Sequence, residues 1–230
     1  MSATAIVRAD ESASVVRRVL TSSIGLKIIM AVTGVVLSGF VLLHMIGNLI
    51  AFTGAEAMDA YAAALRKVPA ALWGIRIVLL ASVILHIWAY IKLTFTSLGA
   101  RSKNYQKVAH QESTLASRTM RWTGPLLAVF IVYHILHMTT GTVHPQFEEG
   151  KVYANLLSGL QVTWVLWFYL VAMGALAVHL HHGIWSLFQS IGISQPRYAS
   201  FGRRLATAFT IVVAGGFVLI PLAILMGLLK

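Results

Sequence analysis

The chain alternates between five long apolar runs and shorter polar connections. The runs cover residues 26–52, 72–98, 122–140, 164–188 and 205–229. Each has about the 20 apolar residues that an α-helix needs to cross a bilayer, and none contains an aspartate or glutamate. The pattern therefore predicts an all-α membrane protein, a bundle of five transmembrane helices. Residues 1–25 are predicted to be an N-terminal segment, and residues 26–230 a single transmembrane domain.

Local signals refine this pattern at three places. The first run is too long for the apolar part of a signal peptide, although Ala55-Glu56-Ala57 mimics a cleavage site, so we interpret the run as a retained helix. Pro125 is predicted in the first turn of the third helix, where proline is tolerated. Pro221 is predicted to kink the fifth helix.

Composition excludes several classes of protein. The chain is 58% hydrophobic and 11% charged, whereas a soluble domain carries about 25% charged residues. It has no cysteine, which excludes disulfides and metal centres held by thiolates of this chain. The net charge of +11 could indicate nucleic-acid binding. The basic residues flank the apolar runs, however, which favours membrane topology over a nucleic-acid partner.

Most of the 18 lysines and arginines lie on one predicted side of the membrane. They occur in the N-terminal segment, in the connection after the second run and in the connection after the fourth run. Cytoplasmic loops are enriched in basic residues. The N-terminus is therefore predicted to be cytoplasmic and the C-terminus outside.

Histidines occur in four of the five apolar runs, where ionisable groups are functional candidates by default. A neutral imidazole nitrogen is a ligand for haem iron. Two histidines on one iron leave no open position, which suits electron transfer rather than oxygen chemistry. The intramembrane histidines are His44, His86, His134, His137, His179, His181 and His182.

Depth along each helix predicts which histidines face one another. At about 1.5 Å per residue, His86 lies roughly 20 Å and His179 roughly 22 Å from the outer face, which predicts a pair towards the cytoplasmic side. His44 lies roughly 27 Å and His134 roughly 18 Å from the inner face, both in the outer half. The arithmetic leaves His137 as an alternative to His134.

The fourth helix also leaves alternatives open. His179 and His182 share a helix face, while His181 points nearly opposite to His179. Only one of the three is needed as a ligand. Small residues at Gly34, Gly39, Gly174 and Gly183 would let a neighbouring helix or a flat macrocycle approach the backbone.

Other chemistries fit less well. Zinc hydrolysis would need a base near its ligands, as in H-E-x-x-H, and no such motif occurs. The lack of acids in the apolar runs also disfavours a proton-coupled transporter and a Ser–His–Asp system. No helix carries paired histidines at long spacing, unlike the cytochrome of quinol–cytochrome c reductases. The remaining alternative is a haem-free structural anchor whose histidines only pack.

Several segments resemble a known family. Residues 22–27 (SSIGLK), 30–34 (MAVTG) and 44–49 (HMIGNL) resemble the type-B di-haem cytochrome b membrane subunit of succinate dehydrogenases and fumarate reductases. Residues 113–120 (STLASRTM) before 122–124 (WTG) are similar to the same family, as is His179 followed by 183–186 (GIWS). The resemblance covers essentially the whole chain, including its five-span plan.

This resemblance implies two b-type haems held by four axial histidines, one on each of the first four helices. His44 and His134 would hold the distal haem, and His86 and His179 the proximal haem nearer the cytoplasm. Electrons would pass between an iron–sulfur subunit and membrane quinone. The chain would thus be a subunit of succinate:quinone oxidoreductase, an enzyme of the respiratory chain and the tricarboxylic acid cycle, without the catalytic head.

The resemblance also implies partners and a location. A flavoprotein carrying FAD and an iron–sulfur protein would assemble with the chain in a bacterial inner (cytoplasmic) membrane. The basic connections, including Arg118 and Arg121, are a hypothetical docking platform for the iron–sulfur protein. An alternative is the anchor of another di-haem quinol oxidoreductase with a different dehydrogenase. No quinone pocket is predicted from the sequence, and neither is the direction of the reaction.

Overall fold

The computed structural model describes residues 17, 20–99, 115–190 and 196–229, and these form helices and short connections. Most of the predicted N-terminal segment 1–25 and most of the basic connection between the second and third spans lie outside the described residues. The helices are α2 (Ser23–Leu49), η1 (Ile50–Thr53), α3 (Ala55–Arg66), α4 (Pro69–Gly99), α5 (Leu115–Met138), α6 (Val152–Gln161), α7 (Thr163–Ser190) and α8 (Pro196–Leu225).

Five of these helices are long and apolar enough to cross a membrane: α2 with η1, α4, α5, α7 and α8. The predicted all-α fold with five spans is therefore confirmed. Large apolar side chains such as Leu43, Phe95 and Trp122 are exposed on these helices. A water-soluble protein rarely exposes apolar patches of this extent, whereas lipid chains solvate them. The orientation of the termini stays a prediction.

Two predicted helix starts are wrong, because apolar runs mark only the lipid-embedded part of a helix. The third span begins at Leu115 rather than near 122, so Pro125 lies inside α5 and not in its first turn. Neighbouring helices and local adjustment make an interior proline tolerable in a membrane helix. The fifth span begins at Pro196 rather than near 205, with its basic residues already helical.

Two of the polar connections each contain a short helix. α3 is rich in alanine, the strongest helix former, and carries Glu56 in its first turn and Arg66 in its last, as the helix dipole favours. α6 has no cap from its own N-cap side chain. Asp59 of α3 accepts a hydrogen bond from the Tyr153 backbone N–H at 3.0 Å. This bond caps α6 from a distant part of the chain and ties the two helices together.

The chain divides into two compact units, each described here by itself. Unit 1 comprises Met1–Leu37 and Ile75–Ala109, and unit 2 comprises Ser38–Gly74 and His110–Lys230. The boundaries between the units therefore fall inside two helices, after residue 37 in α2 and after residue 74 in α4. The predicted single transmembrane domain stays a prediction.

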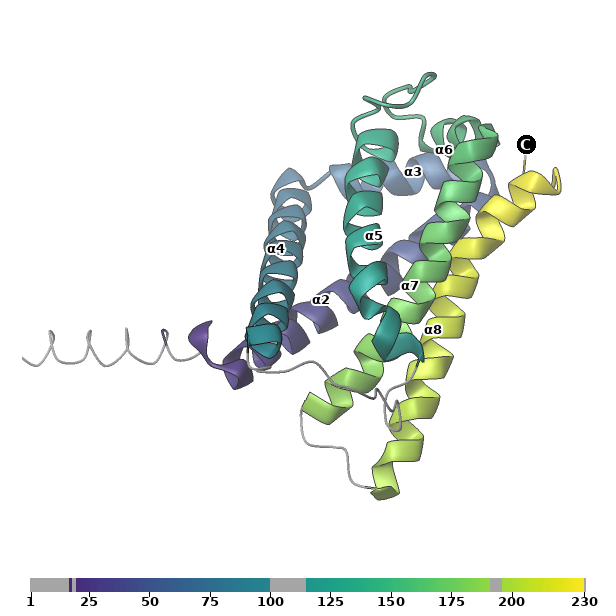
Figure 1. Cartoon of the computed structure of the whole chain (residues 1–230). Helices are drawn as coiled ribbons and strands as arrows, with labels where there is room; N and C mark the ends of the chain where they lie inside the picture. The colour runs from purple at the N-terminus through teal and green to yellow at the C-terminus, as the bar shows by residue number, and fades with distance from the viewer. Residues whose placement is uncertain (1–16, 18–19, 100–114, 191–195, 230) are drawn as a thin grey trace, which may run out of the picture. The chain divides into compact units, whose positions relative to one another are not determined.

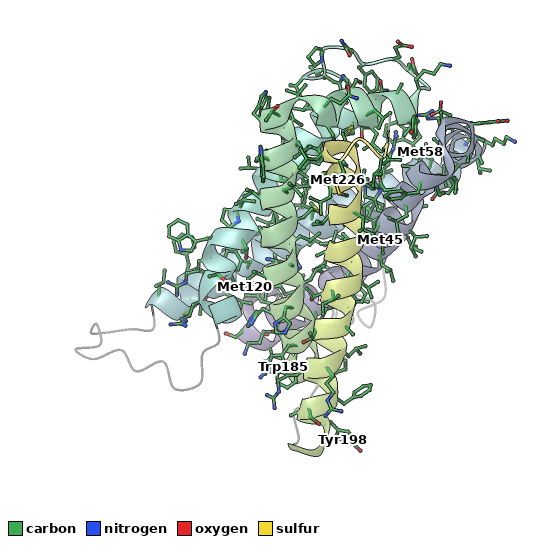
Figure 2. All side chains as sticks on the ribbon, turned by 90° about the vertical axis from the view of Figure 1, so that its right-hand side faces the viewer. Met45, Met58, Met120, Trp185, Tyr198 and Met226 are labelled. Carbon is green, nitrogen blue, oxygen red and sulfur yellow. The ribbon has the colours of Figure 1, made fainter. Side chains whose placement is uncertain are left out.

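Unit 2 is built around α7, which lies beside α8 on one side and α5 on another (Figure 1). Its core joins Tyr169 and Met173 of α7, Phe130 of α5 and Ile220 of α8. Met45 of α2, labelled in Figure 2, lies directly against Gly216 of α8, where a larger residue would not fit. This contact brings the later part of α2 against α8.

Candidate functional site

The rings of His44 and His134 face each other inside unit 2. Their centroids lie 5.8 Å apart and their planes cross at 77°. Phe40 stacks on His44 at 5.3 Å, Phe217 approaches His44 at 5.8 Å, and Phe130 stacks on His134 at 5.6 Å. The structure thus brings together the two histidines predicted to form the distal pair, in an aromatic and apolar surrounding.

The residues after His44 support its helix turn. The Asn48 side-chain amide donates to the His44 carbonyl at 2.7 Å. Gly47 faces Tyr61 of α3, and a Cβ on Gly47 would lie 3.0 Å from the Tyr61 hydroxyl. The HMIGN segment, which carried part of the family resemblance, therefore has a structural role. Asn48 stabilises the helix turn that follows His44, and Gly47 lets α3 pack closely.

His134 and His137 share one hydroxyl. The Tyr169 hydroxyl on α7 lies 3.2 Å from His134 Nδ1 and 3.0 Å from His137 Nδ1. The two histidines are one turn apart on α5, which explains why depth alone left both as candidates. Tyr169 itself is buried. It therefore holds both rings by their Nδ1 atoms.

His137 also contacts the connection between α5 and α6. Its ring is 1% exposed and stacks on His144 at 4.7 Å. His144 Nε2 donates to the Asn155 carbonyl at 2.9 Å, while its Nδ1 accepts from the Gln146 backbone N–H at 3.2 Å. Both nitrogens of His144 are occupied by protein groups, so His144 acts as a structural residue.

Gly159 of α6 makes this packing possible, and its replacement gives a first prediction. A Cβ on Gly159 would lie 2.7 Å from His137 Cε1 and 2.8 Å from His144 Nε2. Both rings are buried and stacked, so they have little room to move. Gly159→Ala is expected to destabilise the protein by about 1–3 kcal/mol, the usual cost of overpacking. Thermal unfolding in detergent measures it.

Gly150→Ala is not a suitable control, because Gly150 has a positive φ of 86°. Gly174→Ala is the matched control, since a Cβ there meets no described atom within 4 Å. Equal unfolding temperatures for the Gly159 and Gly174 variants would contradict the packing described here.

His86 is described within unit 1. Its Nδ1 lies 3.0 Å from the Thr33 hydroxyl of α2. That hydroxyl also donates to the Ile29 carbonyl at 2.7 Å. A threonine has a single hydroxyl hydrogen, so the bond to His86 is donated by Nδ1–H, and Nε2 carries the lone pair. A Cβ added at Gly34 would be in ordinary van der Waals contact with this ring, 3.6 Å from His86 Cε1.

His179 is described within unit 2. Its Nδ1 lies 3.4 Å from the Thr123 hydroxyl of α5. Beside Gly183, one turn further along α7, an added Cβ would meet no described atom within 4 Å. His181 is joined instead to α8, where Thr207 donates to the Arg203 carbonyl at 3.0 Å and its oxygen faces His181 Nε2 at 3.2 Å.

Three of the four predicted ligands thus share one feature, a hydroxyl at Nδ1. Metal-bound histidines usually donate their other ring N–H to a fixed acceptor, which sets the tautomer and orients the ring. The His44 and His134 rings, whose centroids lie 5.8 Å apart, are close enough to bind one iron together. These residues fit a haem held by two imidazoles.

Other kinds of metal centre lack a ligand set here. Among the described residues, no group of three or more His, Cys, Asp or Glu side chains is placed to hold a metal ion. A haem needs only axial ligands from the protein because the macrocycle supplies the remaining donors. The structure brings His44 and His134 together, whereas His86 and His179 belong to different units. The proximal pairing therefore stays a prediction.

The hydroxyls of Thr33, Thr123 and Tyr169 were not predicted from the sequence to be partners of the histidines. Their polarity inside apolar runs was a visible signal, since buried hydroxyls need partners. Which histidine each one meets depends on how separate helices pack. His144 and Asn155 carried no comparable signal, because polar residues in a connection are expected.

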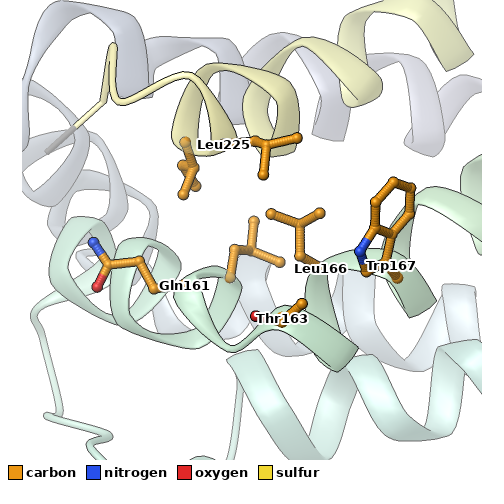
Figure 3. A pocket seen from close by; sticks show the side chains of 7 residues that line it. Gln161, Thr163, Leu166, Trp167 and Leu225 are labelled. Atoms are coloured by element: carbon orange, nitrogen blue, oxygen red, sulfur yellow. The ribbon is translucent and has the colours of Figure 1, made fainter.

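A pocket of about 180 Å³ lies where α6, α7 and the end of α8 meet (Figure 3). Its lining includes Gln161, Thr163, Trp167 and Leu225, and none of the predicted ligands. Sites for small organic ligands usually have volumes of about 300–1,000 Å³. We therefore assign no quinone to this pocket.

Comparison with known proteins gives one match. The model of the family described as "Succinate dehydrogenase/Fumarate reductase transmembrane subunit" matches residues 97–220, which is more than half of the chain. The matched segment contains α5, α6, α7 and most of α8, and with them His134 and His179. No curated protein and no solved structure matches the chain.

Proposed function

The chain belongs to the succinate dehydrogenase/fumarate reductase transmembrane subunit family, and on this premise we propose that it is a di-haem cytochrome b anchor. As a member of that family with five candidate spans, it is a multi-pass membrane subunit of such a complex. The proposal adds that it passes electrons between the iron–sulfur subunit and membrane quinone through two b haems.

The observation that carries this proposal is the facing pair of imidazoles, His44 and His134, with ring centroids 5.8 Å apart. A haem bound between them would supply a one-electron redox couple. His44 and His134 would hold its iron, and the two imidazoles would exclude water from the metal. Phe40, Phe130 and Phe217 would keep the surroundings apolar.

The second pair would be His86 and His179. With the Thr33 hydroxyl accepting the His86 Nδ1–H, Nε2 would be the nitrogen that binds the metal. The Thr123 hydroxyl is placed to do the same for His179. Each threonine would act on the orientation of its ring.

The proposal includes the partners and the location implied by the family. A flavoprotein with FAD and an iron–sulfur protein would assemble on the cytoplasmic side of a bacterial inner membrane. Arg118 and Arg121 are described and exposed at the start of α5. With the predicted orientation they face the cytoplasm, where they would attract an acidic partner surface.

Reversing the charges of Arg118 and Arg121 tests the assignment of the partner subunits. Purification of the tagged chain is expected to recover a succinate-oxidising flavoprotein and an iron–sulfur protein. In the double variant Arg118→Glu and Arg121→Glu, recovery of both partners is expected to fall several-fold, more at low salt than at high salt, because screening weakens charge steering. Subunit ratios on gels and by mass spectrometry measure this.

The matched control reverses Arg66 and Lys67, which are exposed on the predicted outer side. Full recovery of the partners is expected in that variant. Full recovery in the Arg118/Arg121 variant at low salt would argue against the docking platform. Recovery of a dehydrogenase with another substrate would favour the anchor of a different quinol oxidoreductase.

A further inference from the structure

One buried hydroxyl connects the distal ligand to a second histidine that the proposed function does not use. Tyr169 Oη lies within hydrogen-bond distance of His134 Nδ1 and His137 Nδ1. The Tyr169 ring is 8% exposed, and Phe130 packs edge-on against it at 5.0 Å. The hydroxyl therefore has a fixed position between the two imidazoles.

The number of available hydrogens links the bond between Tyr169 and His134 to the bond between Tyr169 and His137. A tyrosine hydroxyl has one hydrogen to donate, and a neutral imidazole has one N–H. The hydroxyl hydrogen and both Nδ1 atoms are all satisfied when one histidine donates to Tyr169 and the other accepts from it. If His134 is the donor, its proton is on Nδ1 and its Nε2 carries the lone pair that a metal needs.

His137 is suited to be the acceptor. Its ring is held by the stack on His144, and His144 is fixed by the Asn155 carbonyl and the Gln146 backbone N–H. Gly159 closes the space beside both rings. The acceptor is thus anchored to α6 and the outer connection, and it does not depend on the ligand.

The hydroxyl beside His86, that of Thr33, has a different kind of acceptor. The Thr33 hydroxyl donates to a carbonyl of its own helix, Ile29, and accepts from His86. At His134 the hydroxyl that accepts from the ligand donates instead to a side chain, His137. A substitution of His137 can therefore change the hydrogen bond to His134 while the ring of Tyr169 stays in place. No such substitution exists for Thr33, because its acceptor is a backbone carbonyl.

We propose that Tyr169 is a positioning residue that sets the tautomer of His134 and tunes the redox group held by His44 and His134, with His137 as the acceptor that orients its hydroxyl. The inference rests on the proposed function, because it requires a metal at His134. Tyr169 acts through His134, whose Nδ1 lies 3.2 Å from its hydroxyl.

Tyr169→Phe in the purified complex tests the proposal. The ring and its packing remain, but the acceptor for His134 Nδ1–H is lost. A ligand without that acceptor donates less electron density to the metal. The expected result is an unchanged haem content with a higher midpoint potential for one haem, the distal one, measured by redox titration of the visible spectrum and by EPR.

Two further variants make the result specific. Tyr133→Phe makes the same chemical change one residue before His134, at a hydroxyl that has no hydrogen-bond partner among the described residues, and both potentials are expected to stay at the wild-type values. His137→Phe keeps a ring against His144 but removes the acceptor for the Tyr169 hydrogen. It is expected to raise the same potential by a smaller amount, since a hydroxyl that no longer donates is a weaker acceptor.

The outcomes separate this inference from the proposed function. Wild-type potentials in both the Tyr169 and His137 variants, with haem bound, would overturn the positioning role and leave the di-haem anchor standing. Equal shifts in the Tyr133 and Tyr169 variants would also overturn it. Absence of haem from the wild-type complex would overturn the proposed function itself. If the Tyr169 variant does not assemble, the midpoint potential of the His137 variant tests the positioning role: an unchanged potential would overturn it.

Discussion

Replacing His134 with alanine is expected to lower the haem content of the purified complex from about two per chain to about one. The side chain faces His44 at 5.8 Å, and His137, one turn away, is held in its stack with His144. An iron with one axial ligand in an apolar site binds less tightly, so the distal haem is lost. Pyridine haemochrome spectra relative to protein measure the change.

The matched control is His137→Phe, one turn further along α5. It keeps a ring against His144 and Tyr133 and is expected to retain both haems. The comparison decides between the two histidines that depth along the helix could not separate. Loss of a haem from the His137 variant, with both haems retained in the His134 variant, would reverse the ligand assignment.

Replacing His179 with alanine is expected to remove the other haem and to leave the pair held by His44 and His134. His179 lies on α7, with its Nδ1 3.4 Å from the Thr123 hydroxyl, and its loss would remove one of the two proposed ligands of the proximal haem. The remaining haem should keep the redox potential and EPR signal of the distal site. Haem content and EPR on the same sample separate the two haems.

The control for this second experiment is His181→Ala. His181 is joined to Thr207 of α8, and its replacement is expected to leave both haems in place with a modest loss of stability, the usual cost of about 0.5–1.5 kcal/mol for one hydrogen bond. Retention of both haems in the His179 variant would refute the predicted proximal pair.

The five spans were predictable from sequence because the bilayer imposes a length of apolar chain that needs no knowledge of tertiary contacts. The helix ends were harder to predict, because α5 begins at Leu115 and α8 at Pro196, both in polar sequence before the apolar runs. α3 and α6 were missed because a search for long apolar runs passes over short helices. The alanines of α3 did carry a propensity signal, whereas α6 depends on the cap from Asp59.

The candidate ligands were also visible in the sequence, but their surroundings were not. Spacing along α5 could not choose between His134 and His137, because one turn of about 5.4 Å is within the uncertainty of the span ends. The structure shows the two in different settings: His134 faces His44, and His137 stacks on His144. Tyr169, which contacts both, is distant in sequence and meets them only because α5 and α7 pack together.

The central claim is that this chain binds two b haems through four histidines, and the most direct test is the number of b haems per polypeptide in the purified wild-type complex. A pyridine haemochrome assay with haem supplied during expression gives this number. We expect a value of about two. A value near one would mean that one histidine pair is misassigned, and a value near zero would contradict the claim and favour a haem-free structural anchor.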